Sequence, residues 1–348
     1  MNVPKLRFKE FKDDYIKLRY KDVLKIKSGK DQKQVEDKNG KYPILGTGGQ
    51  IGKTNSFLYD KPSVLIGRKG TINKPQYMES PFWTVDTLFY SHIYEPNIPK
   101  YLFYSFQNVN WKKYDESTGV PSLSSSTIES VECSIPSPDE QIKIANFLSL
   151  LDKKIELQTK KIEDLKLFKL CNYDNLFSNQ THEVQLKNIS KIEKGKQLNN
   201  ELLIENGSYY MLNGGVSPSG YTNEYNTNEN TITISEGGSS CGYVNFNKNK
   251  FWCGGHCYKV IPNGINNNYL YHNLKYNEKK IMDLRVGSGL PNIQKKDIEN
   301  FKISIHNENE QLKISNYFDK YDLKILLEEN KLNKLIELKK GLMQNMFV

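Results

Sequence analysis

The sequence lacks the features that define several protein classes. No stretch of its 348 residues approaches the ~18 consecutive apolar residues that a transmembrane helix needs, so we expect no membrane span. The first residues, Met1 to Phe8, hold no apolar segment like that of a secretory signal peptide. Five cysteines are an odd and low number for a disulfide framework. Free thiols and a cytoplasmic location are therefore expected.

Residues for catalysis are also scarce. The five histidines are scattered and form no repeated acid–base cluster. The sequence contains neither the Asn-Pro-Pro-Tyr tetrad of adenine methyltransferases nor a Gly-x-Gly-x-x-Gly run after a strand. The glycine-rich stretch 46–54 imitates a phosphate loop, but Thr47 stands where that motif needs glycine. We expect no catalytic centre here, and interpret 46–54 as a turn that approaches DNA or as a tight turn of a sheet.

A zinc site is the other alternative that the sequence raises. Cys253, His256 and Cys257, with Cys241 upstream, include two ligand types of zinc, but their separations are irregular and no second Cys-x-x-Cys pair exists. Small buried thiols are the simpler interpretation. We therefore expect this chain to bind no metal.

The chain contains an internal repeat. Residues 139–177 align without a gap on residues 309–347, with 14 identities in 39 positions. A fainter repeat precedes each copy and pairs 42–46 with 210–214. A repeat of this length predicts two copies of one architecture. The chain thus divides into a variable half, a helix, a second variable half and a second helix, with the expected bounds 1–138, 139–178, 179–306 and 307–348.

Both copies of the repeated segment have the apolar spacing of a long helix. Apolar residues recur at steps of three and four, which places one stripe along each helix. Pro136 and Pro138 exclude a helix upstream, and Asp139 is the expected N-terminal cap. About 35 residues at ~1.5 Å each make a rod of roughly 50 Å.

A long helix with a single apolar stripe needs a partner. We expect the two copies to pair antiparallel as a coiled coil, and the alternative is that each packs on its own globular half. The predicted seam consists of Ile144, Leu148, Leu151, Ile155, Ile162, Leu165, Ile314, Phe318, Tyr321, Ile325, Leu332 and Leu335.

The variable halves have a different pattern, with short β-branched and aromatic runs between glycine-rich, asparagine-rich and proline-containing turns. Strands are expected at 63–66, 88–93, 231–235 and 258–261, and helices at 102–112 and 268–282. The predicted fold class is α+β. It consists of two β-rich α/β domains, separated by two long antiparallel helices, with a pseudo-twofold internal repeat.

The positive charge lies in the variable halves. Residues 1–138 carry a net charge of +6 and residues 179–306 a net charge of +3, whereas each helical segment is neutral. Because lysine and arginine supply most of the sequence-independent affinity for DNA, the halves are the expected DNA-binding surfaces. The alternative for the smaller excess in the second half is a solvated surface.

Several segments resemble motifs of one family. They are Val-Pro-Lys-Leu-Arg-Phe at 3–8, the glycine-rich 42–52, Ile-Gly-Arg-Lys-Gly at 66–70, Trp-Thr-Val-Asp-Thr at 83–87, Gly-Val-Pro-Ser-Leu at 119–123, and Pro-Ser-Pro-Asp-Glu-Gln at 136–141. Over essentially its whole length the chain resembles the specificity subunits of type I restriction–modification enzymes. In the second half, Ser235-Glu236-Gly237 replaces Gly67-Arg68-Lys69, and Asp86 has no clear counterpart.

The resemblance implies a non-catalytic subunit that binds double-stranded DNA. Residues 1–138 and 179–306 would be target recognition domains that read an asymmetric, two-part sequence. The chain would assemble with two modification subunits, which methylate adenine, and with restriction subunits. S-adenosylmethionine, ATP and magnesium would be held by those partners, and this chain would bind no cofactor itself.

The repeat supports this function on physical grounds. A pseudo-twofold scaffold presents like surfaces to two copies of one partner. A rod of roughly 50 Å is long enough to separate two readers by about one turn of DNA, roughly 34–36 Å.

Residues in the loops of the two halves are the expected DNA contacts. An exposed Arg68 has the fork that fits guanine O6 and N7 or a phosphate, and the alternative is a solvated turn. Hydroxyl and amide side chains suit phosphate or base-edge contacts, although we favour helix capping for Ser124. The expected contacts are Lys53, Thr54, Arg68, Lys69, Thr71, Ser122 and Ser125 in the first half and Asn213, Tyr221, Ser239, Ser240, Asn292, Gln294 and Lys295 in the second.

Two other functions compete with this one. A scaffold or inhibitor would bind partner proteins through the helices and would not contact DNA. A stand-alone enzyme would turn over S-adenosylmethionine or ATP alone, and the sequence offers no residues for it.

Overall fold

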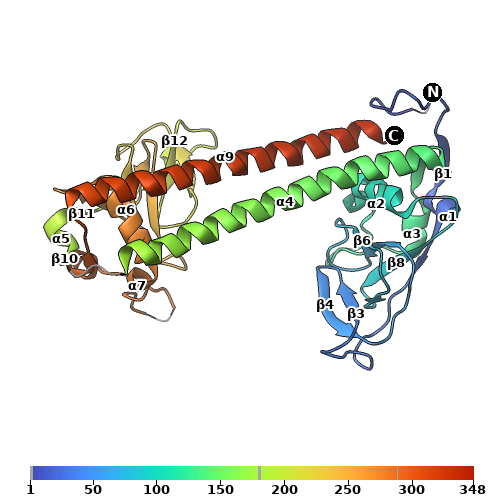
Figure 1. Cartoon of the computed structure of the whole chain (residues 1–348), viewed down its shortest axis with the longest axis horizontal. Coiled ribbons are helices and arrows are strands. Elements are labelled where there is room, and N and C mark those ends of the chain that lie inside the picture. The colour runs from blue at the N-terminus through green and yellow to red at the C-terminus, as the bar shows by residue number, and fades with distance from the viewer. Residues whose placement is uncertain (1–2, 179–181, 288) are drawn as a thin grey trace. The chain divides into compact units, whose positions relative to one another are not determined.

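The computed structural model describes residues 3–178, 182–287 and 289–348, so the predicted boundary at residue 179 lies outside the described part (Figure 1). The chain forms two compact units. Unit 1 consists of Met1–Thr159 and Asn330–Val348, and unit 2 of Lys160–Glu329. Each unit therefore contains one variable half together with a part of both long helices.

Unit 1 is built on a four-stranded antiparallel sheet in the order β2-β8-β5-β6. These strands are β2 (Leu24–Lys27), β8 (Leu88–Ile93), β5 (Ser63–Gly67) and β6 (Gln76–Met78). All five residues of β5 are buried, as the run of apolar side chains in this strand predicts. A second, three-stranded sheet has the order β4-β3-β7, from β4 (Gly49–Thr54), β3 (Tyr42–Gly46) and β7 (Trp83–Thr84).

Unit 2 repeats both sheets in the same order. Its four-stranded sheet is β11-β17-β14-β15, from β11 (Ser190–Lys194), β17 (Cys257–Pro262), β14 (Thr231–Ser235) and β15 (Val244–Asn247). Its three-stranded sheet is β13-β12-β16, from β13 (Gly220–Thr222), β12 (Tyr209–Leu212) and β16 (Trp252–Cys253). Two short antiparallel pairs complete the units, β1 (Ile16–Arg19) with β9 (Glu132–Ile135) and β10 (Glu183–Gln185) with β18 (Lys302–Ser304). The internal repeat thus extends to the strand order of the variable halves.

Short helices cover the sheets of each unit. Unit 1 has α1 (Tyr20–Val23), α2 (Pro99–Asn108), η1 (Trp111–Tyr114) and α3 (Ser125–Ser130). Unit 2 has α5 (Leu186–Ile189), η2 (Asn200–Leu202), α6 (Asn267–Tyr276), α7 (Glu278–Met282) and α8 (Lys295–Asn300). The helix expected at 102–112 therefore starts and ends earlier, and the one expected at 268–282 is two helices.

The two long helices are α4 (Pro138–Phe177) and α9 (Glu308–Met346), the green and red helices of Figure 1. Helix α4 begins one residue before the expected cap, Asp139, because Pro138 is accepted in the first turn, where its missing N–H is not needed. The Oγ atom of Ser137 accepts a hydrogen bond from the Glu140 N–H at 3.4 Å. Ser137 thus takes the capping role that we expected of Asp139.

Within each unit the helices pack antiparallel. In unit 1, Lys339 pairs with Asp152 at 2.6 Å, and in unit 2 Lys161 pairs with Glu328 and Lys169 with Asp322, each at 2.5 Å. All twelve predicted seam residues are buried or half-buried.

Parts of the seam also join the cores of the globular halves. Ile144 and Leu148 pack with Tyr101 in unit 1, and Phe318 packs with Tyr269 in unit 2. The alternative interpretation, packing on the globular half, therefore holds for the start of each helix.

A repeated glutamine anchors the start of each helix. The Gln141 side chain accepts from the Ile98 N–H at 2.8 Å and donates to the Pro136 carbonyl at 3.0 Å. The Gln311 side chain accepts from the Asn266 N–H at 3.2 Å and donates to the His306 carbonyl at 2.8 Å. In each unit the glutamine thus pairs one backbone N–H and one backbone carbonyl that would otherwise lack a hydrogen-bond partner, which explains why both copies of the repeat have glutamine here.

His272 makes the stability of unit 2 dependent on pH. Its side chain is fully buried, with Nδ1 at 2.9 Å from the Tyr173 hydroxyl and Nε2 at 3.2 Å from Asp319. Burial lowers the pKa of His272 and outweighs the opposing hydrogen bond with Asp319. The unfolded state, with a pKa near 6.5, therefore binds this proton first as the pH falls.

We expect the unfolding midpoint to be constant above about pH 7 and to fall as the pH drops below about 6.5. Urea unfolding from pH 8 to 5 measures this. His306, whose pKa burial also lowers, adds to the same slope. His272→Gln should reduce the slope, and an unchanged slope in this variant would contradict the assignment.

Candidate nucleic-acid interface

The loops that follow β5 in unit 1 are held by three backbone hydrogen bonds. The Arg68 N–H donates to the Thr87 carbonyl at 2.8 Å, and the Leu123 N–H donates to the Arg68 carbonyl at 2.9 Å. The Gly70 N–H donates to the Pro121 carbonyl at 2.8 Å. These bonds bring the segments around residues 68–70, 87 and 121–123, which are distant in sequence, to one place at the end of β5.

Unit 2 has the same three hydrogen bonds at the end of β14. The Glu236 N–H donates to the His256 carbonyl at 2.9 Å, and the Ile293 N–H donates to the Glu236 carbonyl at 2.8 Å. The Gly238 N–H donates to the Pro291 carbonyl at 3.0 Å. We call this set of three bonds the loop frame of each unit. Glu236 occupies in unit 2 the frame position that Arg68 occupies in unit 1.

The unit 1 frame presents cations. Arg68 and Lys69 are exposed, and the Arg68 guanidinium makes one long contact of 3.4 Å with the Asp86 carbonyl. A Cβ atom on Gly67 would lie 2.3 Å from the Thr71 carbonyl oxygen, so only glycine permits this close return of the chain. Thr71 itself is half-buried. The predicted Arg68 and Lys69 are thus exposed on a tightly constrained turn.

The serine-rich segment of unit 1 is mainly structural. The Ser124 Oγ atom accepts from the Thr127 N–H at 3.1 Å and caps α3, as expected. Ser122 and Ser125 are half-buried, and the Ser122 N–H donates to Asp115 at 2.9 Å. This backbone hydrogen bond is the main reason why the pKa of Asp115 is lowered. The backbones of Ser122 and Lys69 form an isolated antiparallel β-bridge, so Ser122 lies beside the exposed cations.

Lys53 and Thr54 lie on β4, with different outcomes. Lys53 is exposed and lines a groove of about 460 Å³ with Lys38 and Gln50. Thr54 is fully buried, and its hydroxyl accepts from the Ser56 N–H at 3.0 Å. The prediction that Thr54 contacts DNA is therefore wrong. Successive side chains of a strand point to opposite faces, so Thr54 points inward where Lys53 points outward. The glycine-rich 46–54 forms the turn and the second strand of the β3–β4 hairpin, whereas a phosphate loop leads into a helix.

Two of the predicted unit 2 residues, Asn213 and Ser240, join separate loops through their side chains. The Asn213 side chain accepts from the His256 N–H at 3.1 Å, and the Ser240 hydroxyl donates to the Gly214 carbonyl at 2.7 Å. The Asn292 side chain accepts from Gln294 at 3.1 Å. The structure leaves Ser239, Tyr221, Asn292, Gln294 and Lys295 exposed.

Lys295 lies in a basic groove that the sequence analysis missed. This groove of about 460 Å³ is lined by five lysines, Lys191, Lys194, Lys196, Lys259 and Lys295. Glu193 pairs with Lys191 at 2.7 Å and with Lys259 at 3.1 Å. The lysines come from β11, the loop after it, β17 and α8, so their sequence separation concealed the cluster. In the sequence, Lys191 and Lys194, which lie on one strand, were the signal that could have indicated this groove.

Glu236 is a second residue that the sequence analysis did not assign. Its Oε1 atom accepts from Lys194 Nζ at 2.5 Å and from the Tyr258 hydroxyl at 2.9 Å, and its Oε2 atom lies 3.5 Å from His256 Nδ1. Partial burial raises the pKa of Glu236, but the hydrogen bonds from Lys194 and Tyr258 together outweigh it and lower the pKa. The carboxylate is therefore charged and fixed in orientation.

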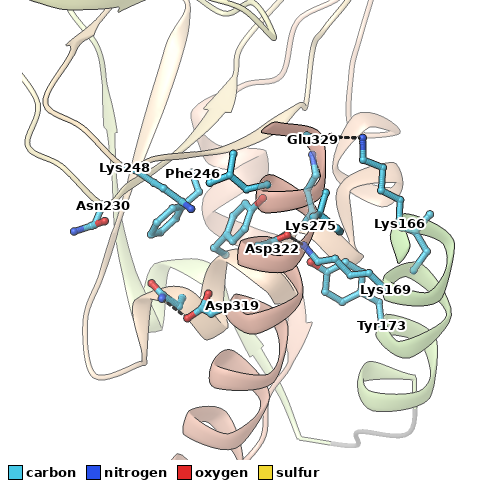
Figure 2. Close-up of a pocket in the computed structure, with 15 residues that line it drawn as sticks. Lys166, Lys169, Tyr173, Asn230, Phe246, Lys248, Lys275, Asp319, Asp322 and Glu329 are labelled. Carbon is cyan, nitrogen blue, oxygen red and sulfur yellow. Dashed lines mark hydrogen bonds and ion pairs between the residues drawn. The ribbon is translucent and has the colours of Figure 1, made fainter. Parts of the chain in front are cut away.

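A pocket of about 630 Å³ lies in unit 2 where α4 and α9 meet α6 and β15 (Figure 2). Lys166 pairs with Glu329 at 2.6 Å, as the dashed line in Figure 2 marks. Lys169 pairs with Asp322, and its pKa is lowered because burial outweighs this pairing. Much of the charge around the pocket is therefore balanced within unit 2.

Unit 1 has the equivalent pocket, of about 620 Å³. Its α9 residues Ile336, Lys339, Lys340 and Met343 are the repeat equivalents of Lys166, Lys169, Leu170 and Tyr173, which line the pocket of unit 2. The two pockets thus share a position in the repeat, although their side chains differ.

The long helices also expose apolar side chains at matching positions of the repeat. Leu157 and Leu327 are each 59% exposed. Phe168 and Leu338 are 50% and 51% exposed. Apolar side chains are thus exposed at equivalent positions in both copies of the repeat. Each long helix therefore has exposed apolar residues in addition to the single apolar stripe that the sequence predicts.

The cysteines are free, and all but Cys171 are buried. The hydrogen bond with Cys257 and burial raise the pKa of Cys253, so this thiol stays protonated. Within 3–178, 182–287 and 289–348, no group of three or more metal-ligating side chains is gathered in one place. No helix in the described ranges has the length and apolar character to cross a membrane.

Comparisons with known proteins give a consistent result. A family model described as the type I restriction modification DNA specificity domain matches the chain twice, over residues 12–167 and 179–338. A type I specificity subunit of Mycoplasma pneumoniae is 36% identical over 172 residues, which are 48% of this chain and 44% of that protein. The match thus spans less than half of this relative's length.

Two further comparisons span more of the chain. The MjaIX specificity subunit of Methanocaldococcus jannaschii is 27% identical over 294 residues, which are 71% of this chain and 68% of that protein. The crystal structure of a type I restriction–modification S subunit from Mycoplasma genitalium has a TM-score of 0.74, with 22% identity and 99% of both chains covered. The latter likeness shows a shared fold.

Proposed function

Since this chain belongs to the family of type I restriction–modification specificity subunits, we propose that it is a non-catalytic reader of an asymmetric, two-part DNA sequence. The observation that carries the proposal is the pair of loop frames, which have the same backbone hydrogen bonds and unlike side chains. Two unlike readers in one chain suit a target whose two parts differ. The excess positive charge of both halves supplies the attraction to phosphates.

In unit 1 we propose that Lys53, Arg68, Lys69, Thr71, Ser122 and Ser125 form the DNA-binding surface. In unit 2 we propose Tyr221, Ser239, Asn292, Gln294 and Lys295, together with the basic groove beside Lys295. Asn213 and Ser240 position the loops that carry these residues. We propose that residues 1–138 and 179–306 are the two domains that recognise DNA.

The long helices provide the proposed docking surfaces for two modification subunits. The matching pockets and the matching exposed apolar residues support two copies of one partner. S-adenosylmethionine, ATP and magnesium would then be held by modification and restriction subunits, with none held by this chain. We also propose that the lengths of α4 and α9, 40 and 39 residues, set the gap between the two parts of the target.

Methylome sequencing of cells with and without this gene, each with its modification subunit, tests the proposed function. We expect methylated adenines in one asymmetric consensus of two parts with a fixed gap, and their loss without the gene. A scaffold or inhibitor that does not contact DNA would leave no gene-dependent consensus. That result, or an uninterrupted consensus, would overturn the proposal.

A further inference from the structure

We propose that the two units read their bases with opposite hydrogen-bonding roles, Arg68 as a donor and Glu236 as an acceptor. Arg68 would take a guanine, whose O6 and N7 atoms accept. Glu236 would take the exocyclic amino group of cytosine or adenine. This inference rests on the proposed function and extends it to the class of base that each unit selects.

Arg68 and Glu236 make the same backbone hydrogen bonds in their two loop frames. In both units the residue donates its N–H to one loop and accepts on its carbonyl from another, with the four distances between 2.8 and 2.9 Å. The side chains of Arg68 and Glu236 therefore leave the backbone at equivalent points of their own units. Their charge and hydrogen-bonding role are reversed, and the Glu236 side chain is 13% exposed whereas Arg68 is exposed.

The environment of Glu236 leaves one oxygen able to accept. Lys194 and Tyr258 both donate to Oε1, which fixes the carboxylate. In the described part of the chain, the recorded neighbour of Oε2 is His256 Nδ1 at 3.5 Å, which is longer than an ordinary hydrogen bond. Because a carboxylate oxygen has two lone pairs, Oε2 keeps acceptor capacity for an amino group.

The surrounding cations explain how a carboxylate is tolerated near DNA. A carboxylate alone would be repelled by phosphates, which are the main source of affinity. Lys194 pairs with Glu236, and Lys196 and Lys295 line the same groove as Lys194. The local excess of lysine therefore keeps the groove attractive to phosphates while Glu236 provides an acceptor.

The loop frame of unit 1 has the opposite hydrogen-bonding role available. The Arg68 side chain makes one long contact with a backbone carbonyl, at 3.4 Å, so most of its N–H groups remain for a ligand. At the frame position of Thr87, unit 2 has His256, whose side chain is 66% exposed beside the carboxylate. The two frames thus differ at two facing positions, which suits different bases.

Glu236→Gln gives a directional test, because Lys194 and Tyr258 fix the orientation of the amide. Both donate to the Oε1 position, so the amide oxygen should take that place and the amide nitrogen should take the place of Oε2. A donor then replaces an acceptor. We expect the preference at one position of the second half-site to move from an amino-bearing base, cytosine or adenine, to guanine or thymine.

The experiment determines the consensus of the assembled complex with its modification subunits, by selection from a random DNA pool and by methylome sequencing. The variants are Glu236→Gln, Arg68→Gln and the control Glu229→Gln, whose carboxyl is exposed in the same unit. We expect a loss of about 5- to 150-fold for the parent base at one position, in the second half-site for Glu236→Gln and in the first for Arg68→Gln. Glu229→Gln should keep the parent consensus.

Each outcome bears on a different claim. A parent consensus that Glu236→Gln leaves unchanged would overturn this inference while leaving the proposed function intact. The absence of any two-part consensus in the parent would overturn the proposed function. If Glu236→Gln unfolds, Tyr258→Phe removes one anchor of Oε1 and should relax discrimination at the same position, and full retention of discrimination there would overturn the inference.

Discussion

A chain carrying both Leu157→Glu and Leu327→Glu is expected to fold and to lose assembly with its modification subunits. Each leucine is 59% exposed, so neither contributes much to the folded chain by itself. Burial under a partner would stabilise each contact by about 1.5–3 kcal/mol, and an unpaired carboxylate buried there costs more. We therefore expect affinity for each modification subunit to fall by at least about 100-fold, measured by co-purification and by sedimentation.

Ile16→Glu is the matched control for this variant. Ile16 is 63% exposed on β1, so the change makes the same kind of substitution, with one added negative charge instead of two, at an exposed apolar side chain that is not on the long helices. The control should assemble normally. Normal stoichiometry of the double leucine variant would contradict the docking surface that we propose.

Arg7→Ala is expected to destabilise unit 1 by about 3–5 kcal/mol, the typical cost of leaving a buried charge without its partner. The Glu140 side chain is 1% exposed, and Arg7 donates to both of its oxygens, at 2.9 and 2.8 Å. The Tyr15 hydroxyl adds a third hydrogen bond at 3.0 Å. Without Arg7, a buried carboxylate keeps its desolvation cost and loses its counter-charge.

A double-mutant cycle isolates this interaction. In a Glu140→Gln background, Arg7→Ala should cost clearly less, because no buried charge remains. Glu310 is the repeat equivalent of Glu140 and is exposed, so Glu310→Gln should change stability by under about 0.5 kcal/mol. Urea unfolding measures all four variants, and equal costs of Arg7→Ala in both backgrounds would contradict the assigned role.

The repeat and its helices were predictable because both rest on local patterns. The repeat and its apolar spacing placed α4 and α9 within two residues of their observed bounds, and the predicted seam residues are buried or half-buried. Strands such as β14 were predicted for the same reason, since β-branched runs between turn residues are a short-range signal. The start of α4 differs from the expected one because Ser137, and not Asp139, caps this helix.

The candidate interface was predictable only in part. Arg68 and Lys69 are exposed as expected, but Thr54 is buried, which the alternation of side chains along β4 would have indicated. The basic groove and the partners of Glu236 join β11, β17 and a loop, and no sequence pattern specifies which lysines meet there. The outward leucines were missed because a leucine has the same sequence signal whether a core or a partner covers it.

By itself, the sequence determined the duplication, the two long helices with their seam, and the location of the positive charge, since these depend on residue types at short and regular spacing. The tertiary structure alone decided which loops share a frame, which side chains hold the Glu236 carboxylate, and which apolar side chains remain outside. These properties depend on contacts between residues far apart in the chain, where hydrogen bonds and burial are fixed by the packed fold and are absent from any local pattern.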